Sequence, residues 1–194
     1  MNSRSYKMEA RAEAADATRR RILDAARTLF FAHWYDEVTL NGIAGAAGVS
    51  HQTVLNHFGS KDGVFSALTE LLQVEVIERR GEVRPGDTAH ALELLLEQYE
   101  TFGLANVRAA QQEHRVPALH AALERARASH RAWVEHAFAH ILPQAGAVRR
   151  QKIAALLAAT EVAAWKSLRH DYGFSKRDTA AAIGVLVSAL EAQS

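Results

Sequence analysis

Apolar residues recur every three or four positions along most of this chain, which is the period of an amphipathic α-helix. Ile22, Ala26, Leu29 and Phe30 show this spacing and fall on one face of a helix predicted over residues 18–33. No segment alternates β-branched or aromatic residues with polar ones at every second position, as a half-buried strand would. The pattern therefore predicts an all-α protein.

Two short helices with a tight turn between them are predicted over residues 40–47 and 50–58. Thr39 and Ser50 are of the residue types that cap helix N-termini, and Gly48 is suited to the left-handed conformation that ends a helix. With the apolar Val49 in the turn, this spacing is typical of a helix-turn-helix. The small core expected for this motif consists of Ile43, Ala44, Val49, Val54 and Phe58.

The outward face of the second of these helices carries neutral hydrogen-bonding side chains and no carboxylate. Such a face suits a groove lined by base edges and phosphates, where Asp or Glu would be repelled. Any one of these residues taken alone equally suits an ordinary polar helix surface. Lys61, behind the cap residue Ser60, is placed to reach a phosphate. The residues on this face are His51, Gln52, Thr53, Asn56 and His57.

Three arginines, Arg19, Arg20 and Arg21, fall in the first turn of the helix predicted from Thr18. Cations at a helix N-terminus oppose the helix dipole, so their placement needs a reason. Contact of this region with phosphates is one explanation, and a solvated basic start is the other.

The run from Ile22 to Ala26 with Leu29 and Phe30, followed by the segment from Thr39 to Phe65, resembles the N-terminal domain of the tetracycline-repressor (TetR) family of transcriptional regulators. The resemblance implies a homodimer that binds a double-stranded DNA operator and releases it on binding a small molecule. It also implies a recognition helix over residues 50–58. The DNA-binding residues predicted together are Thr39, Ser50, His51, Gln52, Thr53, Asn56, His57 and Lys61.

The chain departs from the family pattern at three positions. Leu55 stands where a Tyr that contacts the DNA backbone is usual, which removes one hydrogen bond worth about 1 kcal/mol. Trp34 stands where Gly commonly ends the first helix. Gln52 replaces a small residue and could pair with adenine in the major groove, although a water-exposed Gln is the alternative.

Beyond Lys61 the helices are predicted from periodicity, at residues 62–80, 88–102, 107–114, 118–142, 148–170 and 175–192, with a break at 81–86. The expected organisation is a mobile basic arm (1–17), a helix-turn-helix domain (18–63) and a helical ligand-binding and dimerisation domain (64–194), with about nine helices in all. Small residues at four-residue spacing in the last two helices favour a four-helix dimer interface, or burial of both stripes inside one subunit.

A ligand pocket in such a body would combine apolar walls with a few polar anchors. The candidates, each of which also suits plain core, are Tyr99, Phe102, His114, Trp133, His136 and Trp165. His136 and His140 have the spacing of two metal ligands on one helix face, but Glu-x-x-His and His-Glu-x-x-His patterns are absent. We therefore predict no metal and no cofactor.

Composition narrows the function further. The chain of 194 residues has no Cys, which excludes disulfides, zinc-thiolate sites and cysteine nucleophiles. It shows no secretory signal and no apolar run long enough to span a membrane, so a cytoplasmic protein is expected. Phosphate-loop and nucleophile-elbow motifs are also absent. We expect a ligand-responsive DNA-binding regulator rather than an enzyme, most simply a repressor on a palindromic operator. A helical adaptor for a partner protein and a small helical enzyme are the alternatives.

Overall fold

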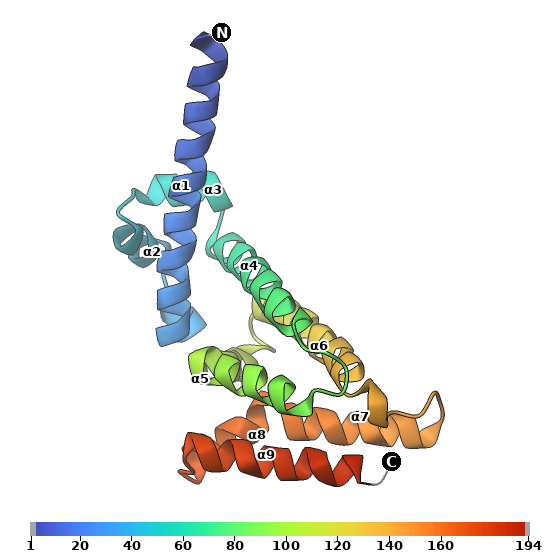
Figure 1. The fold of residues 1–194 in the computed structure, drawn as a ribbon. Helices are drawn as coiled ribbons and strands as arrows, with labels where there is room; N and C mark the ends of the chain where they lie inside the picture. Colours follow the sequence, from blue (N-terminus) through green and yellow to red (C-terminus); the bar gives the residue numbers. More distant parts are fainter. Residues whose placement is uncertain (1–2, 193–194) are drawn as a thin grey trace. The chain divides into compact units, whose positions relative to one another are not determined.

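Every regular element of residues 3–192, the range described by this computed structural model, is helical (Figure 1). The all-α prediction is confirmed. The chain divides into two compact units, Met1–Leu72 and Gln73–Ser194. The helices are α1 (Ser3–Ala32), α2 (Leu40–Ala47), α3 (His51–Phe58), α4 (Lys61–Gly81), α5 (Thr88–Gln112), α6 (Pro117–Ala137), α7 (Ala147–Thr160), α8 (Val162–Lys166) and α9 (Lys176–Glu191).

The first helix is longer than predicted. It begins at Ser3 rather than Thr18, so residues 3–17 of the expected mobile arm are helical, while residues 1–2 lie outside the described range. Ala, Glu and Arg dominate residues 9–14, and these strong helix formers outweigh the cap signal of Thr18. The Thr18 hydroxyl donates instead to the Ala14 carbonyl (2.9 Å). Arg19–Arg21 therefore lie inside α1, and the predicted conflict with the helix dipole does not arise.

The first unit is built around the contacts of α1 with α2 and of α2 with α3. Of the predicted core residues, Ile43, Ala44 and Val54 are buried, whereas Val49 and Phe58 are only partly covered. An aromatic group completes this core: Phe30 stacks on Tyr35 with ring centroids 5.5 Å apart, and Phe65 meets both rings edge-on. This packing fixes the start of α4 against the end of α1.

The second unit packs α5 against α6, α8 and α9, and α7 against α6 and α9. The predicted helices 88–102 and 107–114 form one helix, α5. The residues between them contain no Pro, and their one Gly, Gly103, is buried inside the helix and does not end it. The predicted helix 118–142 ends at Ala137, followed by a 3-10 turn at Ala139–Ile141.

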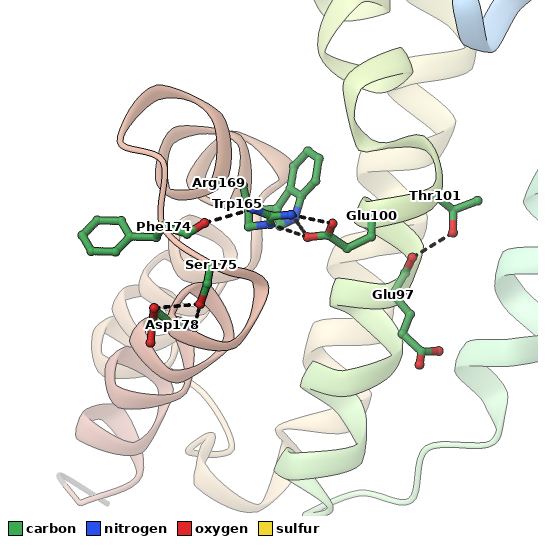
Figure 2. Close-up of polar contacts among 8 residues, drawn as sticks. All are labelled: Glu97, Glu100, Thr101, Trp165, Arg169, Phe174, Ser175 and Asp178. Carbon is green, nitrogen blue, oxygen red and sulfur yellow. Dashed lines mark hydrogen bonds and ion pairs between the residues drawn. The ribbon is translucent and has the colours of Figure 1, made fainter.

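The predicted helix 148–170 is broken at Glu161, whose backbone is extended (φ −71°, ψ 146°). The helix resumes as α8 and continues into a π-helical turn at Ser167–Asp171. Figure 2 shows the contacts that follow the break: the indole N–H of Trp165 donates to Glu100 Oε1 (2.9 Å), and the Arg169 guanidinium donates to both oxygens of Glu100 (2.7 and 3.1 Å). These contacts fasten α8 to α5. Among the described residues, no helix is long and apolar enough to cross a membrane.

Candidate nucleic-acid interface

The helix-turn-helix is set by local hydrogen bonds at the ends of α2 and α3. The Thr39 hydroxyl accepts from the Gly42 amide (3.0 Å), and the Ser50 hydroxyl accepts from the Thr53 amide (3.1 Å). Gly48 ends α2 in the left-handed conformation (φ 65°, ψ 38°), as predicted. Thr39 and Ser50 therefore act as caps, and a capped N-terminus still offers free amides and the positive end of the helix dipole to a phosphate.

The polar face of α3 is exposed at three of the five predicted positions, His51, Gln52 and Asn56. Gln52 and Asn56 are one turn apart and joined by a hydrogen bond from Gln52 Nε2 to Asn56 Oδ1 (2.9 Å). This hydrogen bond holds the two side chains next to each other, with their remaining donors and acceptors on the exposed face of α3. The other two positions are partly buried: the Thr53 hydroxyl bonds the Ser50 hydroxyl (2.8 Å), and the His57 ring contacts the Phe58 ring.

Lys61 makes two contacts with Tyr35 that were not predicted from the sequence. Its ammonium donates to the carbonyl of Tyr35 (3.0 Å) and lies 4.3 Å from the centre of the Tyr35 ring. The Tyr35 hydroxyl in turn donates to Asp62, and burial together with that carboxylate raises the pKa of Tyr35. Lys61 is thereby held next to the end of α3, with ammonium hydrogens left for a further acceptor.

The departures from the family pattern leave the motif intact. Trp34 is extended (φ −66°, ψ 150°), a conformation open to any residue, so the position does not need a glycine. Leu55 is partly buried and offers no hydrogen-bonding group. Arg19 adds a contact that sequence reasoning missed: its guanidinium lies 4.6 Å from the centre of the Phe58 ring and covers the end of α3.

A model of bacterial regulatory proteins of the tetR family matches residues 22–68, which contain the whole motif. The first unit therefore contains a tetR-family domain. It is 30% identical over 92 residues to the HTH-type transcriptional regulator AlkX of Mycobacterium tuberculosis, covering 47% of this chain and 44% of that protein. It is 34% identical over 87 residues to the HTH-type transcriptional regulator AcrR of Shigella flexneri, covering 43% and 40%. These matches span less than half the length of either relative.

Solved structures share the fold over nearly the whole chain. A tetR-family transcriptional regulator from Streptomyces coelicolor has a TM-score of 0.71 at 16% identity, over 92% of this chain and 84% of that one. NalD, the secondary repressor of the MexAB-OprM multidrug efflux pump in Pseudomonas aeruginosa, has a TM-score of 0.58 at 23% identity, over 91% and 95%. The TetR-type fold therefore extends through the second unit, beyond the part that sequence comparison matches.

The residues predicted for a ligand pocket separate into two groups. Tyr99, Trp133 and Trp165 are buried in the core of the second unit, and Phe102 is partly buried. His114 and His136 are exposed and lie outside the hydrophobic core cluster that contains the buried aromatic residues. A polar-tipped aromatic or histidine side chain suits either a core or a surface position, and its residue type does not show which helix face it occupies.

Three buried polar residues of the second unit, Arg80, His130 and Thr160, form a connected cluster with two of the predicted pocket residues, Tyr99 and Trp133. We call it the Arg80 cluster; its three polar members were not predicted from the sequence. The guanidinium of Arg80 donates to His130 Nδ1 (3.2 Å), and His130 Nε2 bonds the Thr160 hydroxyl (3.1 Å). The helix period contained the signal for His130, because it precedes the buried residues Trp133, Val134 and Ala137 by three, four and seven positions. The cluster consists of Arg80, Tyr99, His130, Trp133 and Thr160.

His130 is expected to make folding depend on pH. Burial, and then the positive charge of Arg80, lower its pKa from 6.5 to about 3. The unfolded chain therefore binds a proton below pH 6.5 that the folded protein binds only near pH 3, so stability is complete above 6.5 and falls with pH below it. At pH 5 the loss from this residue is about 2 kcal/mol relative to pH 7.

Urea unfolding at pH 7 and pH 5 measures this loss. His130→Asn removes the titrating group, so its stability should change less between the two pH values than that of the unsubstituted protein. His136→Asn, on the same helix but exposed, is the matched control and should keep the full pH dependence. Equal pH dependence in all three proteins would show that His130 is not held neutral.

Proposed function

We propose that this protein is a transcriptional repressor that binds a palindromic DNA operator as a dimer and leaves it when a small molecule binds residues 73–194. The observation that carries the proposal is the exposed, carboxylate-free face of α3, capped by Ser50 and lying within the residues that match the tetR family model. His51, Gln52 and Asn56 would contact base edges, while Thr39, Ser50, Thr53, His57 and Lys61 would hold the backbone phosphates. NalD, which shares the fold, is a repressor.

A footprint on the DNA that flanks the gene, repeated across salt concentrations, tests the proposal. Protection of an inverted repeat supports it, and the two half-sites should lie about one helical turn apart, roughly 34 to 36 Å. No protection there, followed by failure to select any sequence from random DNA, would exclude a DNA-binding function. It would favour the adaptor alternative.

Lys61→Ala should weaken binding to every DNA sequence alike. If the ammonium contacts one phosphate, the slope of log K against log salt should fall by about one. Lys176→Ala, at the exposed start of α9, is the matched control and should leave the slope unchanged. Because Lys61 also bonds Tyr35, thermal unfolding of the variant checks that the first unit is still folded. A loss confined to one operator sequence would contradict a phosphate contact.

We infer that the dimer forms through the C-terminal helices, chiefly through α9. One face of α9 packs in the core through Ile183 and Val187, while Val185 and Leu186 on the other side are 68% and 52% exposed. Ala159, in the small-residue stripe of α7, is buried within its own subunit, which supports a smaller share for α7 than for α9. A second copy of the chain would cover this exposed side of α9. A palindromic operator requires such a dimer, because operator symmetry mirrors protein symmetry.

Val185→Arg should convert the dimer to a monomer, because an isologous interface receives the new charge twice. Sedimentation velocity measures the change, and operator binding should become weaker and lose its dependence on both half-sites. Val74→Arg places the same charge at an exposed valine of α4 (53%); it is the control and should remain dimeric. If the Val185 variant sediments like the unsubstituted protein, α9 does not form the interface.

Release from the operator would depend on linkage between effector and DNA. A ligand that favours one dimer conformation lowers affinity for DNA by its coupling free energy, typically about 1 to 3 kcal/mol. α4 suits the transmission of this change, because it begins at Lys61, close after the recognition helix, and ends at Gly81 in the second unit.

A further inference from the structure

Arg80 is a buried cation without a carboxylate partner. It is 7% exposed, and in the described part of the chain no acidic side chain forms an ion pair with it. Its Nε donates to the amide oxygen of Gln98 (3.1 Å) and its Nη1 to Nδ1 of His130 (3.2 Å), both neutral acceptors. Buried charges in proteins are normally paired, since removal from water is otherwise uncompensated. Burial also lowers the pKa of Arg80, the effect of an incompletely compensated charge.

The other members of the Arg80 cluster are neutral and supply no negative charge. His130 accepts from Arg80 at Nδ1, so its proton is on Nε2 and is donated to the Thr160 hydroxyl, which donates in turn to the Leu156 carbonyl (2.7 Å). The Tyr99 hydroxyl donates to the Thr160 carbonyl (2.7 Å). The carboxylate with an electrostatic effect on Arg80 is that of Glu161, an exposed residue.

A second donor beside the guanidinium is unused. The indole Nε1 of Trp133 is buried and has no hydrogen-bond partner, and the residue as a whole is 7% exposed. The guanidinium carbon of Arg80 lies 4.7 Å from the centre of a Trp133 ring, so the guanidinium and the indole are direct neighbours. Polar groups buried in native proteins are almost always hydrogen-bonded. The Trp133 N–H is therefore a buried donor that is available to a ligand acceptor.

We propose that the Arg80 cluster binds the carboxylate of a small apolar organic acid, with Arg80 and the Trp133 N–H as its donors, and that such acids are the effectors of this protein. The effector assignment rests on the proposed function, whereas the binding site does not. One guanidinium matches the single charge of a carboxylate and leaves half the charge of a phosphate dianion uncompensated. The surrounding core residues, among them Leu95, Leu96 and Phe138, suit an alkyl or aryl tail.

The position of Arg80 connects this site to the proposed switch. Arg80 lies in the last turn of α4, the helix whose first residue is Lys61. An acid held by Arg80 therefore acts directly on the helix that follows the recognition helix in the chain. Binding of the acid would favour a different conformation of α4 and would thereby change the affinity for DNA.

Binding of 4-phenylbutyrate and octanoate to the full chain, against their uncharged amides, tests the site by titration calorimetry. The acids should bind at least about ten times more tightly than the amides, since the hydrogen bonds to a buried guanidinium are charge-assisted. Arg80→Gln should abolish this preference for acids. Arg80→Lys keeps the charge without the planar fork, so it should retain the preference at lower affinity. It also keeps the test valid if Arg80→Gln does not fold.

The two buried tryptophans form a matched pair of variants. Trp133→Phe keeps an aromatic ring and removes the unused donor, so acid binding should weaken by roughly 5- to 10-fold, the value of one hydrogen bond. Trp165→Phe removes a buried N–H that is already bonded to Glu100, and it should change acid binding less than about 2-fold. Equal effects of the two substitutions would show that the Trp133 N–H does not hold the ligand.

The outcomes for the site and for the function are separable. The proposal fails if neither acid binds, if the amides bind as well as the acids, or if Arg80→Gln leaves acid binding unchanged. A footprint on the same preparations reports the function independently: an operator that is protected but never released by the bound acids would refute the effector assignment alone. Acid binding that depends on Arg80, in a protein that binds no DNA sequence, would establish the site and refute the proposed function.

Discussion

Gln52→Glu is expected to weaken operator binding by about 30- to 1000-fold, which corresponds to about 2 to 4 kcal/mol. Gln52 is exposed on α3, and its Nε2 donates to Asn56. Glutamate has the same length, but it loses the donor that could pair with adenine, a contact worth about 1 to 3 kcal/mol. It also places a negative charge among phosphates, which costs about 1 kcal/mol for each charge about 4 Å away in water.

Fluorescence anisotropy with the footprinted operator at fixed salt measures this loss. Gln111→Glu, an exposed residue of α5, makes the same chemical change outside the motif and should bind DNA as the unsubstituted protein does. Gln52→Ala removes the donor without adding charge, so it should alter base preference at one position by about 1 to 3 kcal/mol. If Gln52→Glu binds the operator normally, the exposed face of α3 does not meet DNA, and the repressor proposal loses its main support.

The boundaries of the helix-turn-helix could be predicted to within one residue because local chemistry sets them. Thr39, Gly48 and Ser50 each act within three or four residues of the bond they form or the turn they permit. Thr18 shows the limit of the same argument: it is a good cap residue by type, but the helix-forming residues before it continue the helix and its hydroxyl bonds backward. A cap residue decides a boundary only where its neighbours do not favour a longer helix.

Only part of the candidate ligand site could be predicted: the sequence offers Tyr99 and Trp133 as pocket candidates, but the polar members of the cluster depend on contacts between distant segments. Arg80 and His130 are fifty positions apart in the chain, and neither belongs to a motif. Arg80 also resembles its neighbour Arg79 in sequence, yet Arg79 forms an exposed ion pair with Glu97 while Arg80 is buried. Helix periodicity shows which residues share a face, but it separates Arg79 from Arg80 only when the face of α4 that packs against the core is already known.

Contacts between distant segments also hold α8 against α5, and we expect Trp165 to be the most important single side chain there. Trp165→Ala should reduce the free energy of unfolding by about 3 to 5 kcal/mol, the usual cost of removing a buried tryptophan. The ring is 2% exposed, and its Nε1 bonds Glu100 on α5 (Figure 2). α8 has only five residues and cannot be stable by itself, so its position depends on this side chain.

Gly103 provides the control for this explanation. A Cβ at residue 103 would lie 2.6 Å from Cζ3 of Trp165, so the indole occupies the space that a side chain on α5 would need. Gly103→Ala should therefore cost about 1 to 3 kcal/mol by overpacking, although alanine is the better helix former. In a Trp165→Phe background the conflicting ring atoms are gone, and Gly103→Ala should become neutral or stabilising by up to about 1 kcal/mol.

Urea unfolding of the two single variants and the double variant completes the cycle, and the two substitutions should be strongly non-additive. An equal cost of Gly103→Ala in both backgrounds would mean that the glycine is required by the backbone of α5 and not by the tryptophan. The close approach at Gly103 would then be a consequence of the packing of α8, and some other contact, such as the Arg169–Glu100 ion pair, would have to hold α8 in place.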